Sequence, residues 1–416
     1  MYARKQLDIG FGDLLAGCLA CFRSWSARRL HQQLSAQWSD TGDTLPALSV
    51  RTAFDAWLTV LNLPRGSEVV ASGINIPDMA RILEHHGLKI VPVDLDLETL
   101  ELQSEALDAA ITPRTRLILV AHLFGARLSM EPVFAAARKH PQLLVAEDCA
   151  QAFTGHDDYR GDPRSDLSLF SFGAIKTATA LGGALARIKD AAQRTAVQTR
   201  LATYRRDGRF YFFRRTLKYT VLKTLGLRPC YAAFVKCCRW LGWDYDAVII
   251  NAVRGFKGAD LIPQLHRQPA LPQLALLQRR LTNYSRSRLD DRCRAGSTLN
   301  HALPAHWRSV GFRNPHHTWW LFPVIAPDPQ GLVQTMRAAG FDATATSTQL
   351  TALNGEAGTG RNCARFIRQT VYLPLHPDMS PATLERMAVL LRAQEAQPEQ
   401  TEQSEEFELA PTPVGK

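Results

Sequence analysis

Features that would place this chain among secreted, zinc-binding or membrane-spanning proteins are scarce in its sequence. Its eight cysteines form no paired framework for a chain of 416 residues, and the CLAC motif at Cys18 has no second half and no histidines at zinc-ligand spacing. We therefore expect reduced thiols in a cytosolic protein and no metal site. No apolar stretch has the length and purity of a membrane span, and no zinc finger, recognition helix or RNA-binding signature is present.

The N-terminal segment contains LLAGC, which ends at Cys18 and has the form of a lipoprotein cleavage site. The apolar run before it is short and is interrupted by Asp8 and Asp13, unlike the core of a secretory signal. The pattern favours an amphipathic helix within an N-terminal helical segment of residues 1–44.

Charge is distributed unevenly along the chain. The formal net charge is +10, but the last 24 residues (393–416) contain six glutamates and one lysine, so the remainder is near +15. A basic body predicts anionic partners, either phosphorylated small molecules or a membrane surface, whereas nucleic acid is not expected without a recognition motif. The Glu, Gln and Pro content of residues 393–416 predicts a disordered acidic tail.

Short apolar runs that end in polar or glycine residues alternate with helical segments. The runs begin near residues 69, 90, 117, 143 and 167, and GALARI from Gly183 follows closely enough to return as a neighbouring strand. Strands separated by single helices indicate a mainly parallel sheet that helices cover on both faces. The predicted class is α/β, with the large domain over residues 45–204.

The second half of the chain has a different character. Residues 205–228 contain eight arginines and lysines against one aspartate, interleaved with aromatics, within a predicted helical insertion of residues 205–265. This segment could be a solvated helical face, a phosphate-rich substrate site or a membrane-surface helix, with peripheral membrane contact through residues 205–257. Residues 266–392 predict a helical stretch that leads into a smaller α+β domain.

Lys176 is the single ionisable side chain between Leu167 and Ala186. An ammonium group in so apolar a stretch is costly unless it is paired or neutralised. A lysine that reaches from a buried loop to the surface is one interpretation. A reactive amine is the other, because an apolar environment disfavours the ammonium form and makes the amine more nucleophilic.

Polar residues follow two consecutive predicted strands at the same edge of the sheet. LLVAEDCAQAF places Asp148 and Gln151 there, and LSLFSFGAIK places Ser171 and Lys176 there. Ligands of doubly wound sheets bind beyond the carboxyl ends of the strands. A carboxylate, an amide, a hydroxyl and a lysine in an apolar wall suit an aromatic, phosphorylated cofactor such as pyridoxal 5′-phosphate (PLP).

Four segments resemble, in order and spacing, the DegT-type sugar aminotransferases of PLP fold type I: EVVASGINIPDMARILEHHGLKIVPVDLD, ITPRTRLILVAHLFG, LLVAEDCAQAF and LFSFGAIKTATALGGAL. The resemblance covers residues 47–189 and continues weakly to VYLPLHPDMS. It implies a large PLP-binding domain with a mainly parallel, seven-stranded sheet between helices. It also implies a homodimer whose active sites are completed across the interface.

The resemblance assigns a role to each matched residue. Lys176 would bind the cofactor's aldehyde covalently, and Asp148 would pair with the pyridinium nitrogen. Gln151 would lie near the ring oxygen, and Ser171 would hydrogen-bond the phosphate. Relatives that dehydrate sugars have a histidine at the lysine's position, so Lys176 favours transamination. The alternatives are structural roles: Asp148 could cap a helix, Ser171 could be a hydroxyl at the end of a strand, and Lys176 could extend its amine to the surface.

Two positions depart from the family pattern. Where the family has Gly-Thr at its first phosphate-binding turn, this chain has Val50 and Arg51, followed by Thr52. By resemblance, Arg51, Thr52 and Ile76 are also expected to contact the cofactor. Arg51 could bind phosphate bidentately, or it could be a surface arginine at a helix start. Where the family stacks an aromatic on the cofactor ring, GINIP offers Ile76, which can cover a ring face without the stacking contribution of about 1 kcal/mol.

The expected activity is transfer of an amino group, with glutamate as donor, to a small-molecule keto sugar. By resemblance, the acceptor would be nucleotide- or lipid-linked, in the biosynthesis of a cell-surface glycan or a secondary metabolite in the cytoplasm. The alternatives are another PLP-dependent reaction on an amino or keto compound, or a non-catalytic PLP-fold sensor or assembly protein. His122, which follows a predicted strand, could approach the site or could be a hydrogen-bonded structural histidine.

Overall fold

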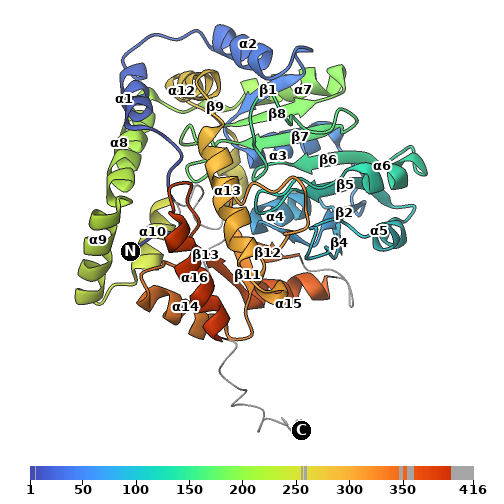
Figure 1. Ribbon diagram of the computed structural model, residues 1–416. Helices are drawn as coiled ribbons and strands as arrows, with labels where there is room; N and C mark the ends of the chain where they lie inside the picture. Colours follow the sequence, from blue (N-terminus) through green and yellow to red (C-terminus); the bar gives the residue numbers. More distant parts are fainter. Residues whose placement is uncertain (5, 254–255, 257–259, 346–349, 354–359, 395–416) are drawn as a thin grey trace, which may run out of the picture.

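The computed structural model describes residues 1–4, 6–253, 256, 260–345, 350–353 and 360–394 (Figure 1). Most of the predicted disordered tail, residues 395–416, lies outside this range. The chain forms a large sheet flanked by helices, a group of helices along one side, and a smaller C-terminal part.

The central sheet has seven strands in the order β1-β8-β7-β6-β5-β2-β4. These strands are β1 (Thr44–Ala47), β8 (Ala184–Ile188), β7 (Leu167–Ser171), β6 (Leu144–Asp148), β5 (Thr115–Ala121), β2 (Glu68–Ser72) and β4 (Lys89–Val93). Only β8 runs against the others, since it pairs antiparallel with both β7 and β1. The predicted α/β class and mainly parallel seven-stranded sheet are confirmed, while β1 is an edge strand that the sequence did not reveal.

Helices cover both faces of this sheet because its strands bury side chains on both sides. In β2, Val69 and Ala71 pack with α3 (Val50–Leu61), α4 (Pro77–His85) and α7 (Ala191–Ala202), whereas Val70 points to the opposite face. That opposite face packs against α5 (Ser104–Ala110) and α6 (Glu131–Arg138). The alternation of side chains along each strand therefore builds two separate cores.

The predicted N-terminal helix is α1 (Phe11–Ala20), followed by α2 (Ala27–Trp38). Both pack with α12 (Leu271–Thr282) against the β7–β8 end of the sheet. Trp38 is fully buried there, with its ring centroid 4.9 Å from that of Phe170. The N-terminal segment is thus an integral part of the core.

The basic segment forms β9 (Arg205–Arg206), α8 (Arg209–Leu225), α9 (Arg228–Trp240), α10 (Tyr245–Val253) and α11 (Leu261–Leu265). β10 (Arg267–Gln268) then returns beside β9 in parallel pairing. α8 packs against α1, and α1, α8 and α9 lie along one side of the molecule (Figure 1).

The C-terminal part is built around β11 (Phe322–Ile325) and β13 (Thr370–Leu373), which pair antiparallel. The predicted helical stretch from residue 271 is divided into α12 and α13 (Ser287–His301), and a short 3₁₀ helix, η1 (Ala305–Trp307), follows. α14 (Pro329–Ala338), α15 (Arg361–Gln369) and α16 (Pro381–Ala393) complete this part. β12 (Thr351–Ala352) pairs with β3 (Ile74–Asn75) and so ties it to the large domain.

Among the described residues, no helix combines the length and the apolar character needed to cross a bilayer.

Candidate active site

A cavity of about 530 Å³ lies at the carboxyl ends of the parallel strands, where β6 ends at Asp148 and β7 ends at Ser171. Six of the seven predicted site residues line it: Lys176, Asp148, Gln151, Ser171, Arg51 and Ile76. The seventh, Thr52, does not. The crossover topology thus brings side chains from four separate sequence segments into one site.

Lys176 follows β7 on a loop, and its side chain is held in an apolar environment. Its Nζ lies 4.1 Å from the centroid of the Trp320 ring. Burial lowers the pKa of Lys176 to about 8, although the nearby Asp148 carboxylate opposes this shift. About one amine in ten is therefore neutral at pH 7, against about one in 3,000 for an ordinary lysine. Lys176 has the character of a nucleophile and a proton carrier rather than of a surface lysine.

Asp148 is the last residue of β6, and burial raises the pKa of its carboxyl group. Its Oδ1 accepts a hydrogen bond from the backbone N–H of Ala150 at 3.0 Å. Among the residues that the structure describes, none donates a hydrogen bond to Oδ2. A buried carboxylate with one open oxygen is suited to pair with a cationic N–H group on a ligand.

Gln151 and Ser171 are both fixed by backbone amides. The Oε1 of Gln151 accepts a hydrogen bond from the N–H of Phe124 at 2.8 Å, and the Oγ of Ser171 accepts one from the N–H of Gly173 at 3.3 Å. Because their acceptor oxygens are used in this way, the Gln151 amide NH₂ and the Ser171 hydroxyl hydrogen remain as donors. Two positioned donors at the cavity suit the oxygens of a phosphorylated ligand.

The N-terminus of α3 also meets the cavity. Ser49 caps this helix, since its Oγ accepts a hydrogen bond from the N–H of Thr52 at 3.1 Å, and Ser49, Val50 and Arg51 line the cavity. The first amides of a helix have no partner within it and favour anions. The role predicted for Thr52 needs correction: its hydroxyl lies 3.0 Å from the Ser49 Oγ in a fully buried position, and Ser49 borders the cavity instead.

The two departures from the family pattern both lie at the cavity. The Nη1 of Arg51 is 2.5 Å from the Oδ2 of Asp78, and its guanidinium lies 4.4 Å from the Phe256 ring centroid. Asp78 therefore offsets part of the charge that Arg51 would offer to a phosphate. Ile76 is half-buried, and its backbone N–H donates to the Oδ1 of Asn75 at 2.7 Å, which fixes it at the cavity wall.

Several cavity residues were missed at the sequence level. Trp320 comes from the C-terminal part, and Tyr211, Arg215 and Lys218 come from α8. Arg267, from β10, also lines the cavity and pairs with Asp207. For the residues of α8 and β10, the only sequence signal was the density of cations after residue 205. Nothing local indicates that α8 folds back to the carboxyl edge of the sheet.

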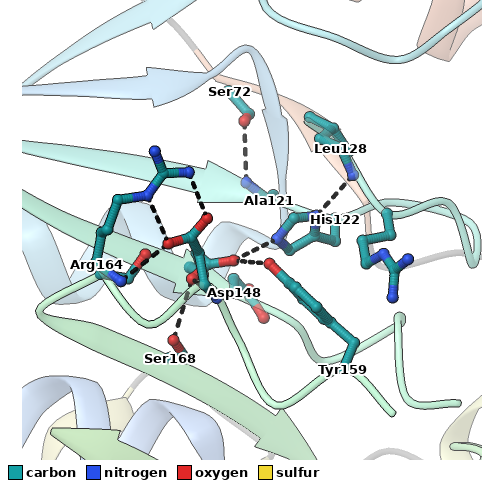
Figure 2. A network of polar contacts seen from close by, with 12 residues as sticks. Ser72, Ala121, His122, Leu128, Asp148, Tyr159, Arg164 and Ser168 are labelled. Carbon is teal, nitrogen blue, oxygen red and sulfur yellow. Dashed lines mark hydrogen bonds and ion pairs between the residues drawn. The ribbon is translucent and has the colours of Figure 1, made fainter. Parts of the chain in front are cut away.

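His122 is buried and takes part in a polar network behind the site (Figure 2). Its Nδ1 accepts a hydrogen bond from the N–H of Leu128 at 3.0 Å, so Nε2 carries the hydrogen and donates to the Oε2 of Glu147, also at 3.0 Å. Glu147 accepts further bonds from the Tyr159 hydroxyl and, at 3.1 Å, from the Ser168 hydroxyl. Burial raises the pKa of Glu147, but these hydrogen bonds outweigh it and leave the pKa below its usual value. His122 is therefore the structural histidine of the two alternatives.

Cys149 lies close enough to His122 and Glu147 for the three side chains to share a cation. Both ring nitrogens of His122 are already hydrogen-bonded, however, and burial raises the pKa of the Cys149 thiol well above its usual value. A protonated thiol and an occupied imidazole are poor metal ligands. We assign no metal to this cluster.

Comparison with known proteins finds a family model that matches part of this chain. Residues 37–219 match the model of the DegT/DnrJ/EryC1/StrS aminotransferase family. The chain is 34% identical over 194 residues to GDP-perosamine synthase from Caulobacter vibrioides, covering 45% of this chain and 52% of that protein. It is 31% identical over 177 residues to L-glutamine:2-deoxy-scyllo-inosose aminotransferase from Micromonospora echinospora, covering 42% of this chain and 41% of that protein. The chain thus spans about half the length of the curated relatives it matches, or less.

The likeness in structure extends much further along the chain. The PLP form of Spr1654 from Streptococcus pneumoniae superposes with a TM-score of 0.67 at 15% identity, covering 94% of this chain and 98% of that one. The fold is therefore PLP fold type I, as the motifs predict. The segment that matches the DegT/DnrJ/EryC1/StrS family model, residues 37–219, contains the strands and loops that carry Asp148, Ser171 and Lys176.

Proposed function

We propose that this protein is a PLP-dependent aminotransferase that acts on a sugar. The observation that carries the proposal is the placement of Lys176 and Asp148 in one buried cavity, the first with a lowered pKa and the second with an open carboxylate oxygen. The match of residues 37–219 to the model of an aminotransferase family supports the same conclusion. The relatives named above are aminotransferases or act on sugars by name, which supports the substrate class.

The residues present fit PLP by their chemistry. Lys176 would supply the amine that holds the aldehyde, and Asp148 would supply an acceptor for the pyridinium N–H. Ser171 and the start of α3 supply donors for the phosphate, and Gln151 supplies an amide donor near the ring oxygen. The open Oδ2 of Asp148 is the sharpest part of this fit, because no described residue donates a hydrogen bond to it and a cationic N–H of a ligand would. When bound, PLP supplies an electron-withdrawing ring that stabilises negative charge at the reacting carbon.

Lys176 also serves as the proton carrier. Once released from the aldehyde, its neutral Nζ would take the proton from the α-carbon of the amino donor, and the resulting ammonium would give that proton back to the bound ligand. A pKa near 8 keeps both forms accessible at neutral pH. The face of Trp320, 4.1 Å away, attracts the ammonium form without donating or accepting a proton. Asp148 would keep the pyridine nitrogen of bound PLP protonated, and the ring needs that positive charge to withdraw electrons.

For the acceptor, we propose a keto sugar linked to a nucleotide or a lipid through phosphate, with glutamate as the donor. Arg215, Lys218 and Arg267 line the cavity beyond Lys176 and provide positive charge for a diphosphate. The printed name of one relative specifies glutamine as donor, so both amino acids belong in the test. We further propose a homodimer working in the cytoplasm, in the biosynthesis of a cell-surface glycan or a secondary metabolite.

The test uses full-length protein loaded with PLP. Addition of glutamate, or of glutamine, should bleach the absorption of the lysine-bound cofactor, and keto sugars should restore it. If the phosphate proposal holds, kcat/KM should be at least about 100-fold higher for a nucleotide-linked keto sugar than for the free sugar. Arg215→Gln should reduce that preference mainly through KM. The matched control, Arg214→Gln, changes a neighbouring exposed arginine of α8 that does not line the cavity.

The possible outcomes separate the two parts of the proposal. Equal efficiency on free and nucleotide-linked sugars would reject phosphate recognition and leave aminotransfer standing. Failure of both amino acids to bleach the cofactor would reject aminotransfer itself in favour of another PLP-dependent reaction.

A further inference from the structure

α1, α8 and α9 expose an unusual number of large apolar side chains on one side of the molecule. On α1 these are Leu15 and Leu19, with Phe22 just beyond the helix, and on α8 they are Phe210, Leu217 and Val221. Phe22 is 73% exposed and Phe210 is 67% exposed. We call these six residues, with the exposed cations of 209–243, the apolar–basic face. Large exposed apolar side chains on neighbouring helices are a mark of an interaction site.

The apolar residues form stripes on two helices that lie against each other. Their spacings, 15-19-22 and 210-217-221, place each set on one side of its helix. The helices run antiparallel, since the Phe22 ring centroid is 5.5 Å from that of Phe213 near the start of α8. At the other end, the Nζ of Lys223 is 5.4 Å from the Phe11 ring centroid. The two stripes therefore belong to adjacent elements along this side (Figure 1).

The charge around these stripes has one sign. Residues 209–243 contain eight arginines and lysines and no aspartate or glutamate. The acidic residue of α1, Asp13, is bound by Arg279 at 2.9 Å and by Arg280 at 2.7 Å. Mixed apolar and cationic side chains complement the surface of an anionic bilayer, where both contributions add.

Two exposed tryptophans strengthen this assignment. Trp240, at the end of α9, is 83% exposed and Trp243 is 60% exposed. Tryptophan side chains are favoured at the boundary between headgroups and acyl chains. A two-fold contact between copies of this chain would place the exposed cations of one copy opposite those of the other, which disfavours self-association through this face.

We propose that the apolar–basic face docks onto anionic membrane surfaces. The helices lie in the plane of the interface, with the apolar stripes and the two tryptophans inserted among the headgroups and the cations against lipid phosphates. α8 connects this face to the cavity, because Tyr211, Arg215 and Lys218 of the same helix line it. A substrate carried on a lipid would reach the cavity from this side, a consequence that rests on the proposed function, whereas docking itself does not.

The test is flotation of the full-length protein with vesicles, without substrate. Vesicles of phosphatidylcholine with 30% phosphatidylglycerol should bind the protein at least about tenfold more tightly than pure phosphatidylcholine, and 0.5 M salt should remove most of the difference. The double variant Leu217→Ser/Val221→Ser and the double variant Lys236→Gln/Arg239→Gln should each weaken binding about tenfold or more. Val389→Ser on α16, which changes another exposed apolar residue, is the control and should bind as the wild type does.

Three results would overturn the proposal. The wild type could fail to float with anionic vesicles, or it could float equally well with neutral ones. The face variants could also leave binding unchanged. Sedimentation velocity on the same variants identifies the competing occupant: if Leu217→Ser/Val221→Ser dissociates a dimer while vesicles bind no protein, the face is a contact between copies of the chain. None of these results depends on turnover, so they leave the proposed function untouched.

Discussion

The Nζ of Lys176 lies 4.1 Å from the centroid of the Trp320 ring, and the indole N–H of Trp320 donates to the carbonyl oxygen of Ile175 at 3.1 Å. One residue of the C-terminal part thus contacts the reactive amine and also holds the backbone next to it. The lysine loop is positioned from outside the large domain.

Replacing Trp320 should therefore impair the amine without unfolding the protein. Trp320→Leu removes both the ring face and the indole N–H, and kcat should fall about tenfold or more, a loss of at least 1.4 kcal/mol. Trp320→Phe keeps a ring and should lose less. Steady-state kinetics with the amino donor measures the effect, and Trp240→Leu, at an exposed tryptophan far along the chain, serves as control. Equal kcat in Trp320→Leu and wild type would contradict the assigned role.

Asp148 and Asp166 form a matched pair for testing the carboxylate. Burial raises the pKa of both, and each accepts a backbone hydrogen bond, from Ala150 and Val145 respectively. Only Asp148 lies at the cavity, since Asp166 precedes β7 at the opposite edge of the sheet. Asp148→Asn should lower kcat about 100-fold or more while PLP still binds, whereas Asp166→Asn should affect stability alone. Comparable kcat values in the two variants would remove Asp148 from the site.

The lowered pKa of Lys176 predicts a pH profile for attachment of PLP. The neutral amine is the reactive form, so the rate should rise about tenfold per pH unit below 8 and level off above it. Stopped-flow absorbance between pH 6 and pH 9.5 measures this. A rate still climbing tenfold per unit at pH 9.5 would indicate an ordinary lysine pKa and an exposed amine.

The network behind the site should contribute to stability rather than to chemistry. Glu147→Gln leaves His122 and Tyr159 without their charged acceptor and buries an amide, so the free energy of unfolding should fall by about 3 kcal/mol. Because the pKa of folded Glu147 is below its usual value, its contribution is present above about pH 4.5 and is lost as the pH falls further. Urea unfolding at pH 7 and pH 4 tests both points.

Glu105→Gln, at an exposed position in the first turn of α5, is the control for this stability measurement and should stay within about 0.5 kcal/mol of the wild type. An unfolding free energy for Glu147→Gln that matches this control would mean that the network does not hold the strands together.

The sheet and the centre of the site were predictable because their signals are local. Each apolar run ends where a strand ends, so the parallel topology brings Asp148 and Lys176 to one edge without further information. Ser49 could also have been found, because a serine just before an apolar helix is a common N-cap. Thr52, the residue that the family resemblance indicates, instead lies buried in the first turn of α3.

The remaining cavity residues depend on long-range packing. Arg215 and Lys218 reach the cavity only because α8 folds back across the carboxyl edge, and Trp320 arrives from a segment more than 140 positions after Lys176. The residue types of α8 do not identify its cavity side, since cations and aromatics occur at both the cavity positions and the exposed positions. The sequence alone therefore does not decide whether the basic segment binds substrate or contacts a membrane. In the structure, residues of α8 line the cavity.

The most direct test of the central claim is covalent capture of PLP. Protein incubated with PLP should show the visible absorption of a lysine-bound cofactor, and borohydride reduction followed by peptide mass spectrometry should find the label on Lys176. Lys176→Ala should show neither band nor label, while Lys189→Ala, which removes an exposed lysine after β8, should behave as the wild type does. A full band in Lys176→Ala, or a label on another lysine in the wild type, would contradict the assignment and the enzyme built on it.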